Sequence, residues 1–144
     1  MHANPLILPR PDFDEVRTAL AHVARTLPGL AAAYAYGSRA RGSANTGSDL
    51  DLALVMGPAA RPGPLFAETV ATRLEQRLAS RVDVDAHRVD HLPLSVLGRV
   101  VTEGVLVFDG DPSARVEFEV STRRLYFDFL PFLERDAREA LTRG

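Results

Sequence analysis

Gly37-Ser38-Arg39-Ala40-Arg41-Gly42-Ser43-Ala44-Asn45-Thr46-Gly47-Ser48-Asp49-Leu50-Asp51-Leu52 is the stretch that decides the fold of this 144-residue chain. It begins with a Gly-Ser turn, continues through small, polar and basic residues, and ends with two aspartates at the start of an apolar run. Because strand side chains alternate between faces, Asp49 and Asp51 are expected on one face and the leucines on the other. Two carboxylates this close repel each other unless a cation lies between them, and hard oxygen ligands suit Mg²⁺.

The Gly-Ser turn at Gly37 and Ser38 predicts an anion site, because such a turn offers backbone N–H groups and a hydroxyl to a phosphate. Phosphate at one end of the stretch and magnesium at the other indicate a nucleoside triphosphate substrate. The alternative is a strand, a glycine-rich turn and a second strand whose aspartates are merely solvated. Acids that share a face at the start of an apolar strand are costly without a cation, which favours the site.

Ser38, ten intervening residues and then Asp49-x-Asp51 fit the G-S-x10-D-x-D signature of the polymerase-beta-like nucleotidyltransferase superfamily. With Arg41-Gly42 and Ser48 also present, the chain resembles the minimal nucleotidyltransferases, which include the MntA antitoxins of HEPN/MNT toxin–antitoxin modules. The resemblance implies an α/β (α+β) fold in which a small mixed sheet is flanked by helices. At this length we expect one domain over residues 1–144.

The resemblance also implies that Asp49 and Asp51 are catalytic and hold two Mg²⁺ ions against the triphosphate of ATP. In the superfamily an acid on a later strand completes this set. Residues 81–87 alternate with a period of two and predict that strand, on which Asp83 and Asp85 share a face. Asp83 matches the superfamily's hydrophobic-Asp-hydrophobic pattern better and is assigned as the third catalytic and metal-binding carboxylate, while Asp85 remains the alternative.

The phosphate-binding residues must include arginine if they include any cation, because all seventeen basic residues are arginine. The guanidinium fork suits phosphate oxygens. For the two loop arginines the alternative is a pair of solvated charges. The predicted nucleotide-binding residues are Gly37, Ser38, Arg39, Arg41 and Ser48.

Local signals predict the remaining elements. Residues 1–11 contain three prolines and are expected to form an extended arm. His87 and His91 are spaced for metal binding on a helix, but Leu92-Pro93 follows, so we expect a loop there. A helix is expected from Phe13 to Leu27, capped by Asp12 and Glu15, and further helices are expected at 65–80 and at 94–103, the last with Gly104 as its C-cap. Strands are expected at 30–36, 50–56 and 105–108. A long helix should start at Asp111-Pro112, and Pro131 should kink or split it.

The segment 112–144 carries a second signal, because five of the chain's ten aromatic residues lie within fifteen positions of it. These aromatics wrap more than one face of a helix, and a small domain buries only one. The surplus predicts a partner interface. The alternative is a helix buried in its own fold or in a homodimer. The predicted interface residues are Tyr126, Phe127, Phe129 and Phe132.

The resemblance implies a function as well. AMP from ATP would be transferred to a tyrosine hydroxyl of a cognate HEPN ribonuclease toxin, in a hetero-oligomer, and the toxin would be neutralised by this AMPylation. Two alternatives remain open. One is a catalytically silent antitoxin that acts by steric binding, and the other is an adenylyltransferase of a small molecule or an RNA end.

Composition narrows the range of partners. The net charge of −2 argues against a non-specific nucleic-acid binder, which usually has a strongly basic balance. The lack of cysteine excludes disulfides and thiolate metal sites. No apolar run approaches membrane-spanning length and the amino terminus lacks a signal-peptide core, so a cytoplasmic protein with no membrane partner is expected.

Overall fold

A four-stranded sheet of order β3-β2-β1-β4 organises the computed structural model, which describes residues 10–37, 40 and 49–143. Strand β1 is antiparallel to both β2 and β4, whereas β2 and β3 are parallel. The predicted mixed sheet flanked by helices is therefore confirmed. In chain order the elements are α1 (Phe13–Thr26), β1 (Leu30–Tyr36), β2 (Leu50–Met56), α2 (Phe66–Arg77), β3 (Val84–Arg88), the 3₁₀ helix η1 (Val89–His91), α3 (Leu94–Glu103), β4 (Val105–Asp109) and α4 (Pro112–Arg143).

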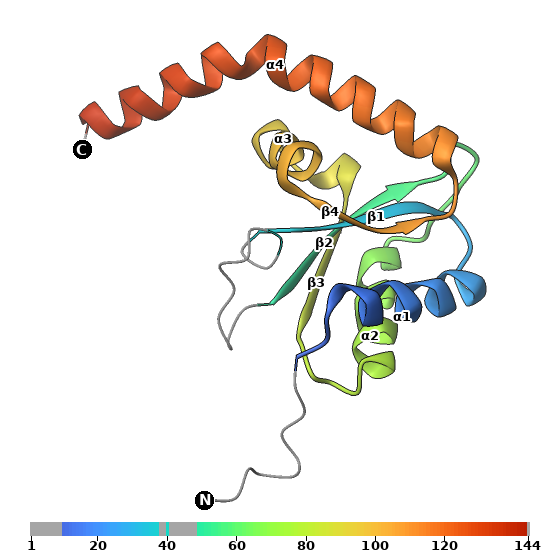
Figure 1. Ribbon diagram of the computed structural model, residues 1–144. Coiled ribbons are helices and arrows are strands. Elements are labelled where there is room, and N and C mark those ends of the chain that lie inside the picture. The colour runs from blue at the N-terminus through green and yellow to red at the C-terminus, as the bar shows by residue number, and fades with distance from the viewer. Residues whose placement is uncertain (1–9, 38–39, 41–48, 144) are drawn as a thin grey trace, which may run out of the picture.

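The two faces of the sheet carry different helices. Helices α1 and α2 cover one face, and α3 and α4 lie over the other (Figure 1). Alternation along β2 assigns its residues to these faces, since Leu50, Leu52 and Leu54 pack in the core with α1 and α2. Ala53 and Val55 pack in the core beneath α3 instead. The odd-numbered residues of β2, including its aspartate, therefore belong to the α3 and α4 face.

The start of α1 follows the predicted capping box. The Asp12 Oδ1 atom accepts a hydrogen bond from the Glu15 N–H at 2.8 Å, and Glu15 Oε1 accepts one from the Asp12 N–H at 3.5 Å. The pair satisfies amides that have no partner inside the helix, and such a cap typically contributes about 1 kcal/mol.

Strand β3 begins later than predicted, at Val84 rather than near Arg81. The backbone after α2 turns sharply, because Ala79 and Ser80 both have positive φ, 53° and 55°. The Arg81 N–H donates to the Leu78 carbonyl at 3.2 Å and so belongs to this turn. Strand pairing can start only after the turn is complete.

Gly104 lies at the C-cap of α3, as predicted, but not in the left-handed conformation that the pattern favours. Its φ and ψ are −69° and 154°, which any residue can adopt. The requirement for glycine comes from close packing instead, because a Cβ atom here would overlap the Val100 carbonyl oxygen.

Helix α4 starts where predicted and continues through Pro131 without being split. Its first turn is capped by Asp111, whose Oδ1 accepts from the Ala114 N–H at 3.2 Å. Pro131 removes the amide that would bond the Phe127 carbonyl, and the helix bends along its length (Figure 1). The predicted kink describes this helix, and the predicted split does not.

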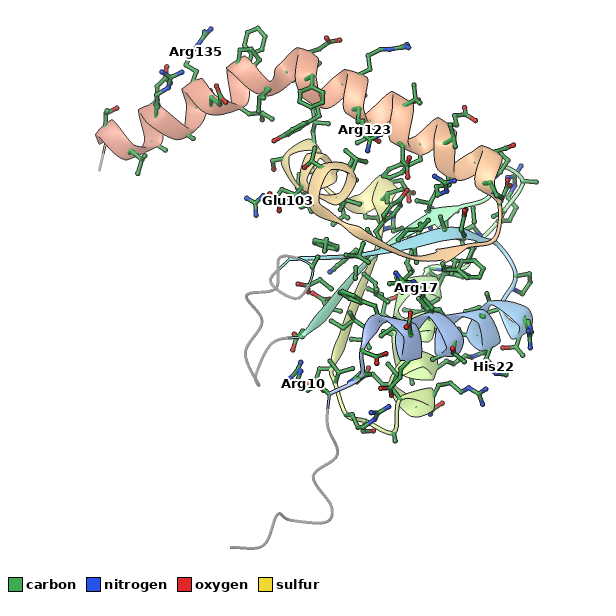
Figure 2. The ribbon with its side chains drawn as sticks, in the orientation of Figure 1. Arg10, Arg17, His22, Glu103, Arg123 and Arg135 are labelled. Carbon is green, nitrogen blue, oxygen red and sulfur yellow. The ribbon has the colours of Figure 1, made fainter. Side chains whose placement is uncertain are left out.

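Contacts with α3 hold the first part of α4. Arg123 points from α4 toward α3 (Figure 2) and donates from Nη2 to the Val101 carbonyl at 3.0 Å. The Tyr126 ring lies directly on Gly98, where a Cβ atom would overlap the ring. Past Tyr126 the helix extends beyond the rest of the domain (Figure 1). Among the described helices, none combines the length and the apolar composition needed to cross a membrane.

The close contact between Gly98 and Tyr126 gives a first prediction. Replacing Gly98 with alanine should lower the free energy of unfolding by about 1 to 3 kcal/mol, because the new methyl group would force the Tyr126 ring and α4 away from α3. Urea denaturation measures the change. Gly63→Ala is the matched control, since a Cβ at Gly63 has no neighbouring atom within 4 Å. Equal stability of the two variants would contradict the packing described here.

Candidate active site at the sheet edge

The sheet register brings three polar side chains into one row. Tyr36 of β1 is paired with Asp51 of β2, and Asp51 is paired with Asp85 of β3. Side chains of register-paired residues point to the same side of a sheet. The row therefore lies on the α3 and α4 face, at the end of the sheet where β1 finishes and β2 begins. Tyr36 is a member of this site that sequence reasoning missed, although its place directly before Gly37 was a usable signal.

Gly37 brings the backbone up against the Asp51 carboxylate. Its φ is +77°, a conformation that favours glycine, and a Cβ atom at this position would lie 2.6 Å from Asp51 Oδ2. Glycine is thus required both by backbone conformation and by space. The turn that was predicted to bind phosphate accordingly starts beside the aspartate that was predicted to bind the metal.

The carboxylates at this row repel one another. Burial raises the pKa of Asp51, and the neighbouring carboxylates of Asp85 and Asp49 raise it further, while His87 acts in the opposite direction. Burial also raises the pKa of Tyr36 to about 12, with added contributions from Asp51 and Asp85. Several acids held together in a partly buried site favour the binding of a cation.

The structure separates the two candidates for the third carboxylate. Asp85 lies in β3 directly opposite Asp51. Asp83 precedes the strand, where its carbonyl accepts a hydrogen bond from the Leu50 N–H at 2.8 Å. Asp83 therefore lies beside Leu50, the first residue of β2, which follows Asp49 in the sequence. Asp49 and Asp83 are both exposed. Asp85, rather than Asp83, shares the row with Asp51 and contributes to raising its pKa.

His87 is the second residue that sequence reasoning did not include in this site. It lies in β3, within the strand predicted over residues 81–87, and its Nε2 is 2.9 Å from Asp85 Oδ1. His91 is in η1 and contacts Asp90 at 3.8 Å. The signal for His87 was present, because it follows Asp85 by two positions and strand alternation puts both on one face.

The donor set of the site fits magnesium. Asp49 and Asp51 supply hard carboxylate oxygens, and Mg²⁺ commonly takes one or two carboxylates and completes its shell with water and phosphate oxygens. Burial, and after it the charges of Asp85 and Asp49, raise the pKa of Asp51, and a divalent cation would relieve the repulsion between these carboxylates. Within the described ranges, no three histidine, cysteine or acidic side chains are already gathered as a complete metal-binding group. Of the predicted nucleotide-binding residues, Gly37 is described, whereas Ser38, Arg39, Arg41 and Ser48 lie outside the described residues.

The four predicted interface aromatics divide into two groups. Tyr126 is used inside the domain, against Gly98. Phe127, Phe129 and Phe132 are 56%, 47% and 53% exposed. The Phe132 ring also lies beneath the Arg135 guanidinium, 5.4 Å from ring centroid to Cζ. We refer to Phe127, Phe129 and Phe132 together as the outer aromatic surface of α4.

The sequence of the chain matches a known protein family. The family described as "Polymerase beta, Nucleotidyltransferase" matches residues 19–113, which include the whole sheet and the acidic row. No curated protein gives a significant match to the chain.

Several solved structures have the same fold. A chain from the crystal structure of a toxin–antitoxin with AMP-PNP superposes with a TM-score of 0.68 at 21% identity, over 87% of this chain and 98% of that one. A chain from the structure of the tri-AMPylated Shewanella oneidensis HEPN toxin in complex with MNT antitoxin gives a TM-score of 0.67 at 18% identity, over 90% of this chain and 99% of that one. A chain of the toxin–antitoxin MntA-HepT gives 0.65 at 19% identity, over 89% and 98%. At these identities the likeness establishes the fold.

The raised pKa of Asp51 predicts a cost in stability. A carboxyl group whose pKa is higher in the folded state stabilises the fold while protonated, and this contribution is lost as the pH rises through the folded-state pKa. At pH 7 without divalent metal, Asp51→Asn should therefore raise the thermal midpoint, because it removes a charge that is disfavoured by burial and by the neighbouring carboxylates. The difference should shrink as the pH falls from the raised folded-state pKa toward the ordinary aspartate pKa of about 3.9, and it should be absent below that value.

Thermal melts at several pH values, with and without Mg²⁺, measure this effect. Added Mg²⁺ should stabilise the unsubstituted chain and leave Asp51→Asn unchanged. Asp14→Asn is the control, since Asp14 is an exposed aspartate on α1, away from the row. An Asp51→Asn protein that is less stable than the parent at pH 7 would contradict the charge crowding.

Proposed function

Because the chain belongs to the polymerase beta nucleotidyltransferase family, we propose that it is a Mg²⁺-dependent adenylyltransferase that acts as an antitoxin. In this proposal it transfers AMP from ATP to a tyrosine hydroxyl of a cognate HEPN-type ribonuclease toxin and thereby neutralises the toxin. The observation that carries the proposal is the row of Tyr36, Asp51 and Asp85 beside Gly37 at one edge of the sheet. Structures of similar fold that contain AMP-PNP, or an AMPylated toxin with its antitoxin, support it.

The residues in and beside the acidic row would have different roles. Asp49 and Asp51 would hold Mg²⁺, with Asp85, the carboxylate opposite Asp51 in the register, as the further ligand in place of Asp83. When bound, the metal neutralises charge on the triphosphate and on the leaving pyrophosphate. Gly37 must be glycine to lie this close to Asp51. Together with Ser38 it would form the turn whose backbone N–H groups and hydroxyl bind the phosphates. Arg39, Arg41 and Ser48 would complete the phosphate contacts.

Strand β3 would face the acceptor. It is an edge strand, and the Asp85 side chain is 54% exposed on its site face. An acceptor hydroxyl arriving at this edge would attack the α-phosphorus in line. The acceptor hydroxyl would give up its proton to a carboxylate of the row as its oxygen bonds to the α-phosphorus, the bond from the α-phosphorus to the bridging oxygen breaks, and pyrophosphate leaves. The protein's contribution to such a reaction is mainly positioning and charge compensation.

The outer aromatic surface of α4 would bind the partner. Phe127, Phe129 and Phe132 are about half exposed although they are large and apolar, which is typical of an interface. In Figure 1 the outer part of α4 extends over the side of the molecule at which β1 ends and β2 begins. A partner on this surface would therefore be on the same side of the molecule as the active-site edge.

The catalytic part of the proposal predicts a mass change in the toxin. Incubation of a HEPN-type partner with this chain, ATP and Mg²⁺ should add one or more AMP units, measured by intact-mass spectrometry. Asp49→Asn with Asp51→Asn should abolish the gain, because the metal loses both carboxylates. In cells the same double variant should fail to neutralise the toxin while remaining folded.

Other outcomes would select other functions. A stable complex without any mass gain, together with full neutralisation by the double variant, would indicate a steric antitoxin. Neither gain nor complex would indicate a small-molecule or RNA-end acceptor.

The interface part of the proposal makes a separate prediction. Phe127→Ala with Phe129→Ala should weaken binding to the HEPN-type partner at least tenfold, since exposed aromatic anchors dominate interface energies. Isothermal titration calorimetry measures the affinity. The unfolding midpoint should stay close to that of the parent. Tyr126→Ala is the contrasting variant and should lower the midpoint, because its ring packs on Gly98. Unfolding of the double phenylalanine variant would show that these rings are core residues.

A further inference from the structure

Helix α4 carries two apolar faces, and only one of them continues the contact with the domain. Residues spaced alternately by four and three lie along one side of a helix, because a turn takes 3.6 residues. Phe118 and Thr122 pack toward the domain, and at this spacing they are followed by Leu125, Phe129 and Phe132. The face of α4 that packs on the domain therefore continues into these two rings where the helix extends beyond the domain (Figure 1).

The other apolar face lies on the opposite side of α4. Its residues Val116, Val120 and Phe127 are 46%, 49% and 56% exposed, and Leu141 near the end of the helix is 81% exposed. They belong to one unbroken series with alternating spacings of four and three. We refer to this series as the heptad seam; its members are Val116, Val120, Arg123, Phe127, Leu130, Glu134, Ala137 and Leu141. Six of the eight are apolar, which is typical of a helix that packs along a second helix.

The two charged members of the heptad seam determine how a second copy of α4 can lie on it. In a parallel pair each residue faces its own copy, so arginine at position 123 would meet arginine and glutamate at position 134 would meet glutamate. In an antiparallel pair Arg123 can face Glu134 of the second copy, which replaces repulsion by attraction. The same register makes every other layer of the seam apolar, since it sets Val116 against Leu141, Val120 against Ala137 and Phe127 against Leu130.

A further pair of charges beside the heptad seam fits the same register. Glu117 follows Val116 directly, Arg138 follows Ala137 directly, and both charged side chains are exposed. In the antiparallel register Glu117 of one copy faces Arg138 of the other, at the flanking positions that set partner choice in coiled coils. Twofold symmetry forms each charge pair twice.

Arg123 can take part in this contact although it already bonds α3. Its Nη2 atom donates to the Val101 carbonyl at 3.0 Å, and a guanidinium carries five N–H donors. The Arg123 side chain is 50% exposed, so a carboxylate of a second copy can reach it.

We propose that the heptad seam of α4 binds a second copy of this chain as an antiparallel helix pair. The complementarity is that of α4 with itself, since the apolar layers and both charge pairs match in a single register. The pair covers Phe127 and leaves Phe129 and Phe132, on the other side of the helix, to the partner of the proposed function. The dimer requires neither nucleotide nor metal nor toxin, so it is tested separately from the proposed nucleotidyl transfer.

Sedimentation equilibrium of the full chain, without ATP or any other protein, tests the inference. The parent should form a dimer in a concentration-dependent manner. Glu117→Arg and Arg138→Glu should each raise the dissociation constant about tenfold, because two attractive charge pairs become repulsive. Glu117→Arg combined with Arg138→Glu should recover the parent value. The two positions are about 30 Å apart within one helix, so only a contact between copies can produce this recovery.

Two further variants separate the contact from folding. Leu141→Glu should also raise the dissociation constant about tenfold or more, and it should leave the thermal midpoint of the dissociated chain unchanged, because Leu141 is 81% exposed within one copy. Asp136→Arg is the matched control for Glu117→Arg. Asp136 is an exposed acid on the side of α4 opposite the heptad seam, so this variant should dimerise like the parent.

Three results would overturn the inference. The first is a parent chain that is monomeric at every concentration measured; if Leu141→Glu then weakens binding of the HEPN-type partner, the heptad seam belongs to that partner instead. The second is a dimer that Leu141→Glu leaves intact, which places the contact elsewhere. The third is dissociation by both single charge reversals without recovery in the double variant, which excludes the antiparallel register.

Discussion

The repulsion between carboxylates at one edge of the sheet is the constraint on which the site depends. Asp51 is paired in register with Asp85, and the backbone at Gly37 closes on the Asp51 carboxylate from the other side. Burial first, and then the charges of Asp85 and Asp49, raise the pKa of Asp51, and a divalent cation would relieve the repulsion between the carboxylates. The opposite face of the same strand offsets the cost, because Leu50 and Leu52 are fully buried against α1 and α2.

Local signals were sufficient to predict most of the fold. The capping box at Asp12 and Glu15, the alternation of β2 and the cap at Asp111 each depend on residues within a few positions of one another, and all are present in the structure. The start of β3 was wrong because it depends on the turn after α2, where Ala79 and Ser80 adopt positive φ without a glycine to mark it. Neither alanine nor serine carries a sequence signal for that conformation.

The composition of the site depended on information that the sequence does not contain locally. Strand alternation put both Asp83 and Asp85 on one face, but only the parallel register with β2 decides which of them meets Asp51. The same register adds Tyr36 to the row from a third strand. Tyr126 is a comparable case, because its partial burial depends on the contact with Gly98 of α3, and aromatic spacing alone cannot distinguish it from its exposed neighbour Phe127.

The strand that supplies the site also anchors the helix that carries the outer aromatic surface. Tyr34 lies two residues before Tyr36 on the same face of β1, and its hydroxyl donates to Glu119 Oε1 of α4 at 2.5 Å. Arg115 extends the anchor by pairing with Asp109 of β4 at 3.0 Å and with Glu119 at 3.3 Å. Tyr34 is buried, and the charged side chains of Arg115, Asp109 and Glu119 are 22%, 30% and 20% exposed, so these bonds join β1, β4 and α4 at a partly buried junction. A partner bound to the outer part of α4 would consequently be held at a fixed position relative to β1 and its acidic row, which is what transfer to a side chain of that partner requires.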